Sequence, residues 1–393
     1  MNEQDLRHLL TITVEDVRPA HPAVAGWERA RRTRRTRRAV GAVALAVTLL
    51  SGGAVAALRP PAGPPPDRAV APTVEPSQAP PVQRLPAELG YPGDPLARLA
   101  DPATVPLSAR PVRRALALFQ PFDEDHRTDG PVRVLGDDGV VRALDVVTPA
   151  PTRDRAGNEA TALKPGVLSP DGRSAAFVQT GSLLLVDLTT AAVRRIPLDG
   201  DLELVVWAGD RVVVGGDDRV YAVDRASGAA SPMDVSAWDL VAPDPAAGRE
   251  AVLVEVGGER GGLLLRTRSA RDGAVRTEQR ITDTVLPTPY QVNEFYGRGW
   301  LHGERLARSA WIVSDVIDGA EGVVVLDART GTVAHVLDLG RDRWKSCCEV
   351  LGWDDRGAVL LRLQPGGLLR WHPDTGEVTG VVRNLTGTIA LAG

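Results

Sequence analysis

The chain has 393 residues, enough for one large domain or two ordinary ones, and its formal net charge is −4. It contains two cysteines, adjacent in sequence, which excludes both a disulfide-stapled scaffold and a cysteine-based zinc site. Lysine is almost absent, with Lys164 and Lys345 the two among 46 basic residues, a bias typical of a high-GC bacterial genome.

The N-terminal region is basic, unlike the rest of the chain. Residues 1–38 carry nine arginines against five acidic residues, a net charge of +4, so the remainder carries −8. Anionic lipid headgroups are a nearer partner for this short segment than nucleic acid. Residues 1–28 are interpreted either as a disordered cytoplasmic tail or as a short helix that binds a partner. The arginines interpreted as a topology signal are Arg31, Arg32, Arg34, Arg35, Arg37 and Arg38.

An uncharged segment of 20 residues, 39–58, follows these arginines directly. As a helix it would span about 30 Å, the thickness of the hydrocarbon core of a bilayer. The preceding positive charge predicts a cytoplasmic N-terminus and an extracytoplasmic C-terminal part of a single-pass protein of the cell membrane. A cleaved signal peptide is the alternative, because residues 54–56 (Ala-Val-Ala) resemble a cleavage site. The long basic region before the segment favours a retained transmembrane helix.

Residues 59–110 are rich in proline, with three consecutive prolines at 64–66. Proline lacks the backbone N–H group that helices and sheets need, and it favours the extended polyproline conformation. We therefore predict a semi-rigid linker between the membrane and a globular domain.

Residues 111–393 are expected to form an all-β domain. Short apolar runs alternate with turns that contain Gly and Asp every 8–12 residues, and no long helical periodicity is found. Asp171-Gly172 and residues 137–139 (Asp-Asp-Gly) are expected to form tight hairpin turns.

A repeat runs through this domain. Each copy is a short apolar strand that ends in a polar turn, and the copies are separated by 37–60 residues. A period near 40–45 residues with about four strands per copy is typical of a β-propeller, here with six or seven blades. The last strand, near residues 388–392, is expected to close the ring against residues 115–119. The anchor positions of the copies are 145, 187, 224, 267, 327 and 372.

One copy carries a family resemblance. Residues 169–173 (Ser-Pro-Asp-Gly-Arg), followed by 185–188 (Leu-Val-Asp-Leu), resemble the blade repeat of WD40-like and TolB-type propellers. The whole layout is similar to actinobacterial single-pass membrane proteins with such a propeller outside the cell. The resemblance specifies a fold. Because some members are thought to neighbour sigma-factor genes, it also implies a signalling or anti-sigma-like role for the cytoplasmic tail.

Enzyme signatures are absent from the sequence. It has no G-x-S-x-G, no GK[ST] phosphate loop and no H-E-x-x-H, and its six histidines are scattered without ligand spacing. We identify no catalytic, cofactor-binding or metal-binding residues and expect no cofactor. Cys347 and Cys348 are candidates for a vicinal disulfide in an oxidising compartment, or for two thiols of which at least one is buried.

Aromatic residues gather in the longest interval of the repeat, although the chain is otherwise poor in them. Such a cluster can form a platform for a ligand or partner, or it can fill the space between two blades. The platform candidates are Tyr290, Phe295, Tyr296 and Trp300.

These patterns favour a membrane-anchored extracytoplasmic propeller that is not an enzyme. Its predicted role is that of a binding, sensor or scaffold module for a protein or a small ligand. The alternative is an anti-sigma-like regulator that acts on a cytoplasmic partner through the tail. An exported enzyme is less favoured, and nucleic acid is not an expected partner.

Overall fold

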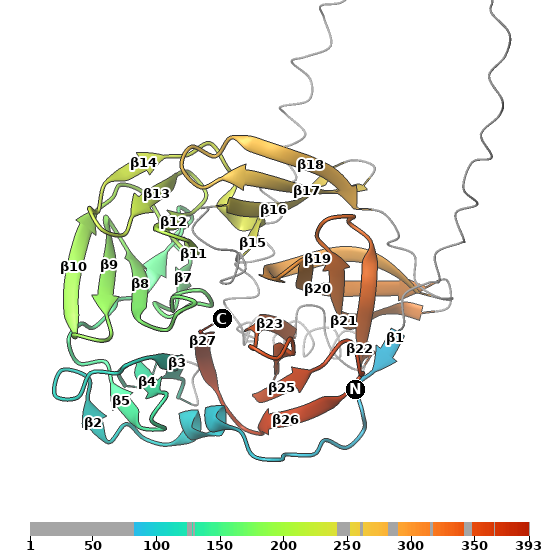
Figure 1. Cartoon of the computed structure of the whole chain (residues 1–393), viewed down its shortest axis with the longest axis horizontal. Helices are drawn as coiled ribbons and strands as arrows, with labels where there is room; N and C mark the ends of the chain where they lie inside the picture. Colours follow the sequence, from blue (N-terminus) through green and yellow to red (C-terminus); the bar gives the residue numbers. More distant parts are fainter. Residues whose placement is uncertain are drawn as a thin grey trace, which may run out of the picture. The chain divides into compact units, whose positions relative to one another are not determined.

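Six mainly antiparallel sheets follow one another around a ring in the described part of the computed structural model (Figure 1). The chain divides into two units, Met1–Gln78 and Ala79–Gly393, and the ring belongs to the second. The prediction of an all-β propeller is confirmed, with six blades. The structure describes residues 82–123, 128, 130–241, 252–259, 262–281, 290–314, 317–341, 348–364 and 366–392.

The blades are numbered along the chain, and within each blade the strands are given from the centre of the ring outward. Blade 1 consists of β27 (Gly387–Leu391), β3 (Ala115–Pro121), β4 (Arg133–Gly136), β5 (Val141–Ala143) and the added strand β2 (Val105–Pro106). Blade 2 consists of β8 (Ser174–Gln179), β9 (Ser182–Asp187) and β10 (Ala192–Pro197). A single bridge between Leu168 and Ala175 marks its innermost position.

The remaining blades have four or five strands each. Blade 3 is β11 (Leu204–Ala208), β12 (Arg211–Gly215), β13 (Val220–Asp224) and β14 (Ala230–Pro232). Blade 4 is β15 (Leu240–Val241), β16 (Val252–Glu259), β17 (Gly262–Ser269) and β18 (Val275–Ile281). Blade 5 is β19 (Tyr290–His302), β20 (Arg305–Ser314), β21 (Ile317–Asp327), β22 (Val333–Gly340) and β1 (Val82–Arg84). Blade 6 is β23 (Cys348–Trp353), β24 (Val359–Leu363), β25 (Gly367–Trp371) and β26 (Val378–Val382).

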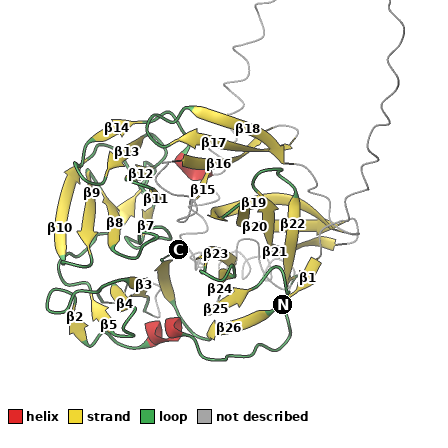
Figure 2. Ribbon diagram, viewed as in Figure 1, coloured by secondary structure: helices red, strands yellow, loops and turns green. Residues whose placement is uncertain are grey.

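Three short elements lie outside this scheme. A small hairpin, β6 (Thr152–Arg153) and β7 (Glu159–Ala160), is inserted between blades 1 and 2. The short helices are η1 (Pro95–Ala100) and η2 (Ala237–Asp239), drawn in red in Figure 2.

The repeated turns have a common chemistry. In blades 2, 3 and 5 an aspartate ends the third strand, and its Oδ1 accepts backbone N–H groups of the turn that follows, as in Asp327 with Thr330 N at 2.7 Å. This carboxylate satisfies donors that the tight turn leaves unpaired. The expected Asp-Gly turns are also present, with φ of +66° at Gly172 and +72° at Gly139, a conformation that favours glycine.

Two anchors of the predicted repeat are out of register. In blade 4 the position equivalent to Asp224 is Ser269, because its carbonyl accepts the same turn hydrogen bond, from Gly273 N at 2.9 Å. The anchor at Thr267 is therefore two residues early. The anchor at Asp145 follows β5, the fourth strand of blade 1, whereas the other copies are third strands. Blades 1 and 4 lack an aspartate at the end of the third strand, so pattern alignment chose neighbouring residues.

Tryptophans on the innermost strands join neighbouring blades. Trp300 Nε1 on β19 donates to Val350 O at 2.9 Å, and Trp353 Nε1 on β23 donates to Trp300 O at 2.8 Å. Trp207 Nε1 on β11 donates to Gly166 O, beside blade 2, at 2.9 Å. These indoles fill the wedges between blades and satisfy their polar N–H groups there.

The ring is closed where its two ends meet. β27 pairs with β3 in antiparallel register, with Ile389 opposite Phe119 and Leu391 opposite Ala117. The expected closure by the last strand is therefore present in blade 1. Such pairing joins the last strand of the propeller to the first blade in one sheet and removes an exposed sheet edge.

Residues 82–112 form a second closure, which we call the strap. β1 pairs in parallel with β22 of blade 5, Gly90 O accepts Gly380 N of blade 6 at 2.8 Å, and β2 pairs with β5 of blade 1. In η1, Leu96 and Leu99 are buried in a core shared by blades 1 and 6. The strap thus connects three consecutive blades.

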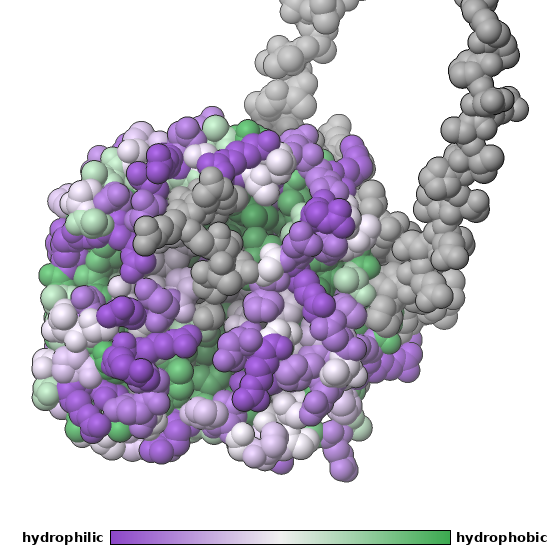
Figure 3. Space-filling model, viewed as in Figure 1, coloured by the Kyte–Doolittle hydropathy of each residue, from purple (hydrophilic) through white to green (hydrophobic). Residues whose placement is uncertain are grey.

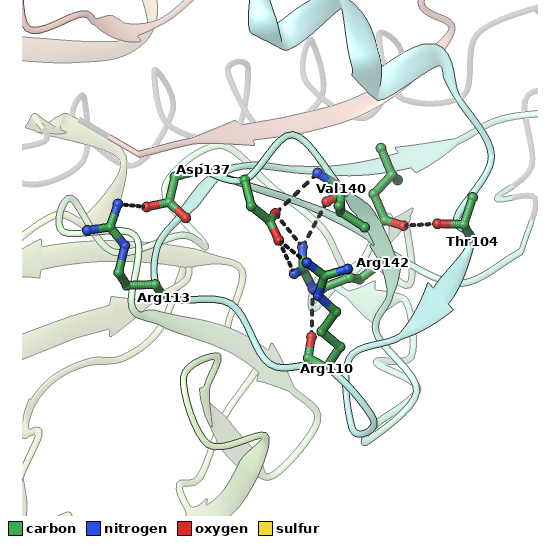
Figure 4. A network of polar contacts seen from close by, with 8 residues as sticks. Thr104, Arg110, Arg113, Asp137, Val140 and Arg142 are labelled. Atoms are coloured by element: carbon green, nitrogen blue, oxygen red, sulfur yellow. Dashed lines mark hydrogen bonds and ion pairs between the residues drawn. The ribbon is translucent and has the colours of Figure 1, made fainter.

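A charged network fixes the end of the strap to blade 1 (Figure 4). The side chain of Arg142, on β5, is 1% exposed and pairs with both carboxylate oxygens of Asp138, at 2.9 and 2.7 Å. Its Nε donates to Arg110 O of the strap at 2.6 Å. The hydrogen bond from Arg142 lowers the pKa of Asp138 to about 2.

The strap corrects the predicted linker. Residues 82–110 were assigned to a Pro-rich spacer, yet they contain β1, η1 and β2 and pack on the propeller. Proline is compatible with this role, because the strap pairs only along sheet edges and Pro95 lies at the start of a helix. Residues 59–81 of the predicted linker lie outside the described residues.

The membrane-spanning prediction is not addressed by the described residues. Among them, no helix has both the length and the apolar character needed to cross a bilayer. The segment 39–58, the tail and the six topology arginines all lie outside the described residues, so the span stays a prediction.

Candidate functional site

The predicted aromatic platform is largely part of the core. Tyr296 and Trp300 are 3% and 9% exposed, and Phe295 is half-buried against the core between blades 4 and 5. Tyr296 also donates its hydroxyl hydrogen to Ala310 O at 3.3 Å. The alternative interpretation, rings that fill the space between blades, therefore describes these residues. The side chain of Tyr290 is not among those that the structure describes.

The adjacent cysteines lie where blade 6 begins. Cys348 is the first residue of β23, is 4% exposed and is disulfide-bonded. Cys347 lies outside the described residues, so the geometry of a vicinal pair stays a prediction. The next residue, Glu349, belongs to a group of charged side chains near the ring axis that sequence analysis did not identify.

We call this group the axial cluster and define it by five side chains from five separate parts of the chain. Its members are Lys164, Glu203, Arg298, Glu349 and Arg362.

Arg298 spans the centre of the ring. It is carried by β19, the innermost strand of blade 5, and its Nη1 donates to Pro165 O at 2.7 Å. Pro165 leads into blade 2, which lies opposite blade 5 in a ring of six. Gly166 makes this approach possible, because a Cβ atom there would lie 1.9 Å from Arg298 Nη1.

Lys164 directly precedes Pro165 in the sequence and lies beside this contact. Its Nζ donates to Thr152 Oγ1 at 2.6 Å and lies 4.0 Å from Glu203 Oε2. Both charged side chains are only 13% exposed. The pKa of Lys164 is lowered to about 8: burial is the main cause, Glu203 opposes the shift, and the nearby Arg298 charge adds to it. Burial likewise raises the pKa of Glu203.

Glu349 and Arg362 form the other side of the cluster. Arg362 Nη2 donates to Glu349 Oε2 at 2.6 Å, and its Nη1 donates to Gly387 O of β27 at 2.9 Å. Burial lowers the pKa of Arg298 to about 10, and Glu349 partly offsets this. A hollow of about 10 Å³ beside Arg362 and Gly387 is about large enough for one water molecule and far smaller than a pocket for a drug-sized ligand.

The β6–β7 hairpin lies beside this cluster, and Figure 1 shows β7 next to β11 near the middle of the ring. Thr152 of the hairpin holds Lys164, and Arg155 pairs with Asp218 in the β12–β13 turn at 3.1 Å. Thr161 contacts Thr388 of β27, with 3.4 Å between the hydroxyl oxygens. The insertion thus borders the axial cluster on the side of blades 1 to 3.

The surface offers little apolar area for docking. Among the described residues, the large hydrophobic side chains that are exposed are Val193 and Val275, on different blades. In the face shown in Figure 3, hydrophilic side chains predominate and separate smaller hydrophobic patches. No group of three or more metal-ligating side chains is found in the described segments. Recognition at the axial cluster would therefore be polar and charge-based.

One signal in the sequence could have drawn attention to this cluster. Lys164 is one of two lysines, so a lysine there is unusual in a chain that uses arginine nearly everywhere. Its partners at positions 203, 298, 349 and 362 could not be grouped from sequence, because they become neighbours only when the ring closes.

No protein-family model and no curated protein sequence matches the chain. Among solved structures, TolB from Acinetobacter baumannii is 14% identical over 70% of this chain and 66% of that chain, with a TM-score of 0.44. A chain of the Mitotic Checkpoint Complex is 16% identical over 64% and 72%, at 0.39. The calcium-binding protein regucalcin from Agrobacterium tumefaciens is 15% identical over 62% and 77%, at 0.34. These distant similarities carry no argument about function, and the assignment of a six-bladed propeller follows from the strand pairing itself.

Proposed function

We propose that the chain is a membrane-anchored, extracytoplasmic propeller that acts as a non-catalytic binding or scaffold module, with the axial cluster as its point of recognition. The observation that carries this proposal is the cluster itself. Perturbed charged groups that converge from several elements are typical of functional sites. The axial cluster lies beside the ring axis, next to the inserted β6–β7 hairpin, which supports binding at the face of the ring that carries this hairpin.

The anchoring half of the proposal rests on residues 39–58 and the arginines before them. We expect the full chain to resist alkaline extraction from membranes and the propeller to be cut by protease added outside intact cells. Release by alkali, or complete protection from external protease, would contradict single-pass anchoring with an extracytoplasmic propeller.

The binding half can be tested with a photo-crosslinking amino acid at two matched positions. Ala156 is exposed in the β6–β7 hairpin, whereas Ala226 is exposed in a turn at the opposite end of the strands of blade 3. Irradiated cells should yield an adduct, detected by intact mass, at position 156. We expect it to be absent at position 226 and lost when Arg298 is replaced by methionine. Equal adducts at both positions would refute recognition by the axial cluster.

A relay through the tail, including the anti-sigma-like alternative, is a separate proposal. It requires that residues 1–28 bind a cytoplasmic partner. A peptide of residues 1–28 that retains nothing in a pull-down would remove this alternative and leave the scaffold function intact.

A further inference from the structure

Arg298 carries a charge that the described part of the chain does not balance. Glu349 pairs with Arg362 at 2.6 Å, and Glu203 lies nearest to Lys164, at 4.0 Å. Within the described residues, no carboxylate oxygen lies within 4.0 Å of Arg298, and its hydrogen bond goes to a backbone carbonyl, Pro165 O. A guanidinium group has five donors in a planar fork, so most of its donor capacity is not used by the described residues.

The surrounding charges set the kind of ligand that fits. The axial cluster contains three cationic side chains and two carboxylates, and Asp154, Asp201 and Asp217 add negative charge on the side of Glu203. The positive charge without a described carboxylate within 4.0 Å is therefore that of Arg298. A partly buried positive charge without a counter-ion is costly, and Arg298 is close enough to Lys164 to lower the pKa of that amine, an effect that Glu203 opposes. One negative charge beside Arg298 would give its guanidinium group a counter-ion.

We propose that the axial cluster binds one carboxylate group, which the Arg298 guanidinium and the Lys164 ammonium group receive together. This inference rests on the proposed function, since it names the ligand chemistry of the same site. The planar fork of Arg298 matches a carboxylate in a bidentate arrangement. A phosphate dianion fits less well, because Asp154, Asp201 and Asp217 add negative charge around Glu203.

The scarcity of lysine makes a direct test possible. Full-length protein labelled with ¹³C at the lysine ε-carbon gives two lysine signals, and a Lys345→Arg variant assigns them. The probe is N-acetylglycine, with the neutral N-acetylglycinamide as its matched control. A bound carboxylate favours charged lysine, so the titration midpoint of Lys164 should rise by about 0.5 pH units or more. The amide should leave it unchanged.

Substitutions at Arg298 show whether the response comes from the axial cluster. Arg298→Gln should abolish the shift, and Arg298→Lys, which keeps the charge without the fork, should weaken binding about tenfold. Arg153→Gln removes an arginine of the neighbouring hairpin that is 65% exposed and pairs with Glu159, and it should respond like the wild type. If Arg298→Gln does not fold, Arg298→Lys alone decides: binding as tight as in the wild type overturns the proposal.

Two further probes separate the sources of the carboxylate. A shift with acetate at the same concentrations supports recognition of small acids, whereas a shift with N-acetylglycine alone supports a peptide C-terminus. An equal shift with inorganic phosphate, or none with any carboxylate, overturns the proposal. If the photo-adduct at position 156 persists while these probes fail, the carboxylate assignment is wrong and the binding function stands. If no adduct forms at position 156 while N-acetylglycine still shifts the Lys164 signal, the carboxylate assignment stands and the proposed binding function is wrong.

Discussion

Two arginines of this protein show how the same side chain serves two purposes. Arg142, where the strap meets blade 1, is 1% exposed and bonds to both oxygens of Asp138 and to two backbone carbonyls. Arg298, near the ring axis, is partly buried and bonds to one carbonyl across the ring. Where the strap meets blade 1, paired charges close the propeller. Near the ring axis, no described carboxylate lies within 4.0 Å of the Arg298 charge. Full pairing indicates a structural role, and a charge without a described counter-ion indicates binding.

Removing the strap should destabilise the closing region, where the strap meets blade 1, more than any other change. A chain that starts at residue 111 loses β1, η1 and β2, including the side chains of Leu96 and Leu99, each worth about 1.5–3 kcal/mol when buried. We expect a loss on the order of 5 kcal/mol in the free energy of unfolding, measured by urea denaturation. A chain that starts at residue 79 should match the full-length propeller. Equal stability of both chains would show that the strap is not part of the fold.

Within the closing region, Arg142 should matter far more than its neighbour Arg113. Arg142→Ala removes a buried guanidinium and leaves carbonyls and Asp138 without their donor, at a cost of about 3 kcal/mol. Arg113 is 88% exposed and pairs with Asp137 at 2.5 Å, so Arg113→Ala should cost about 0.5 kcal/mol or less. Thermal and urea unfolding measure both. Similar losses in the two variants would contradict the assigned role of Arg142.

The same pair predicts a loss of stability in acid. The pKa of Asp138 is lowered from 3.8 to about 2 by Arg142, so its stabilisation is complete above pH 4 and disappears as the pH falls to 2. The carboxylate is 35% exposed, and solvent screening reduces the expected loss to about 1 kcal/mol. Urea midpoints between pH 4.5 and 2 should fall less steeply in Arg142→Ala than in the wild type. Parallel curves would contradict the linkage.

A small stability effect is expected at the axis, although Arg298 is partly buried. Arg298→Met gives up one hydrogen bond to a carbonyl but also removes a partly buried charge that has no described counter-ion. The two effects offset each other, so the change in unfolding free energy should stay within about 1 kcal/mol. The same variant should lose the photo-adduct at position 156. A loss as large as that of Arg142→Ala would place Arg298 among the structural arginines.

The fold could be predicted from sequence because its signals are local. Asp-Gly pairs such as Asp171-Gly172 mark hairpins, and aspartates at 187, 224 and 327 recur at the same point of three blades. The strap could not be predicted, because its prolines resemble a spacer and the partners of Leu96 and Leu99 come from blades 1 and 6. Two repeat anchors were misplaced where Ser269 replaces the usual aspartate and where a fourth strand resembled a third.

The candidate site was harder to predict than the fold. The aromatic cluster was correctly identified as unusual, but Trp300 is used to join blades 5 and 6. The axial cluster depends on contacts such as Arg298 with Pro165, 133 residues apart in sequence. No periodicity brings such residues together, and the scarcity of lysine, interpreted as genome composition, did not identify Lys164 as a site residue.

The most direct test of this account is the pKa of Lys164 in the full-length protein. The ε-¹³C signal of Lys164, followed from pH 6 to 12, should titrate with a midpoint of about 8, because the amine is buried beside Arg298. In Arg298→Met the midpoint should move upward, since a like charge has been removed. A midpoint near 10.5, the ordinary value, in the folded wild-type protein would contradict the burial of Lys164 beside the Arg298 charge.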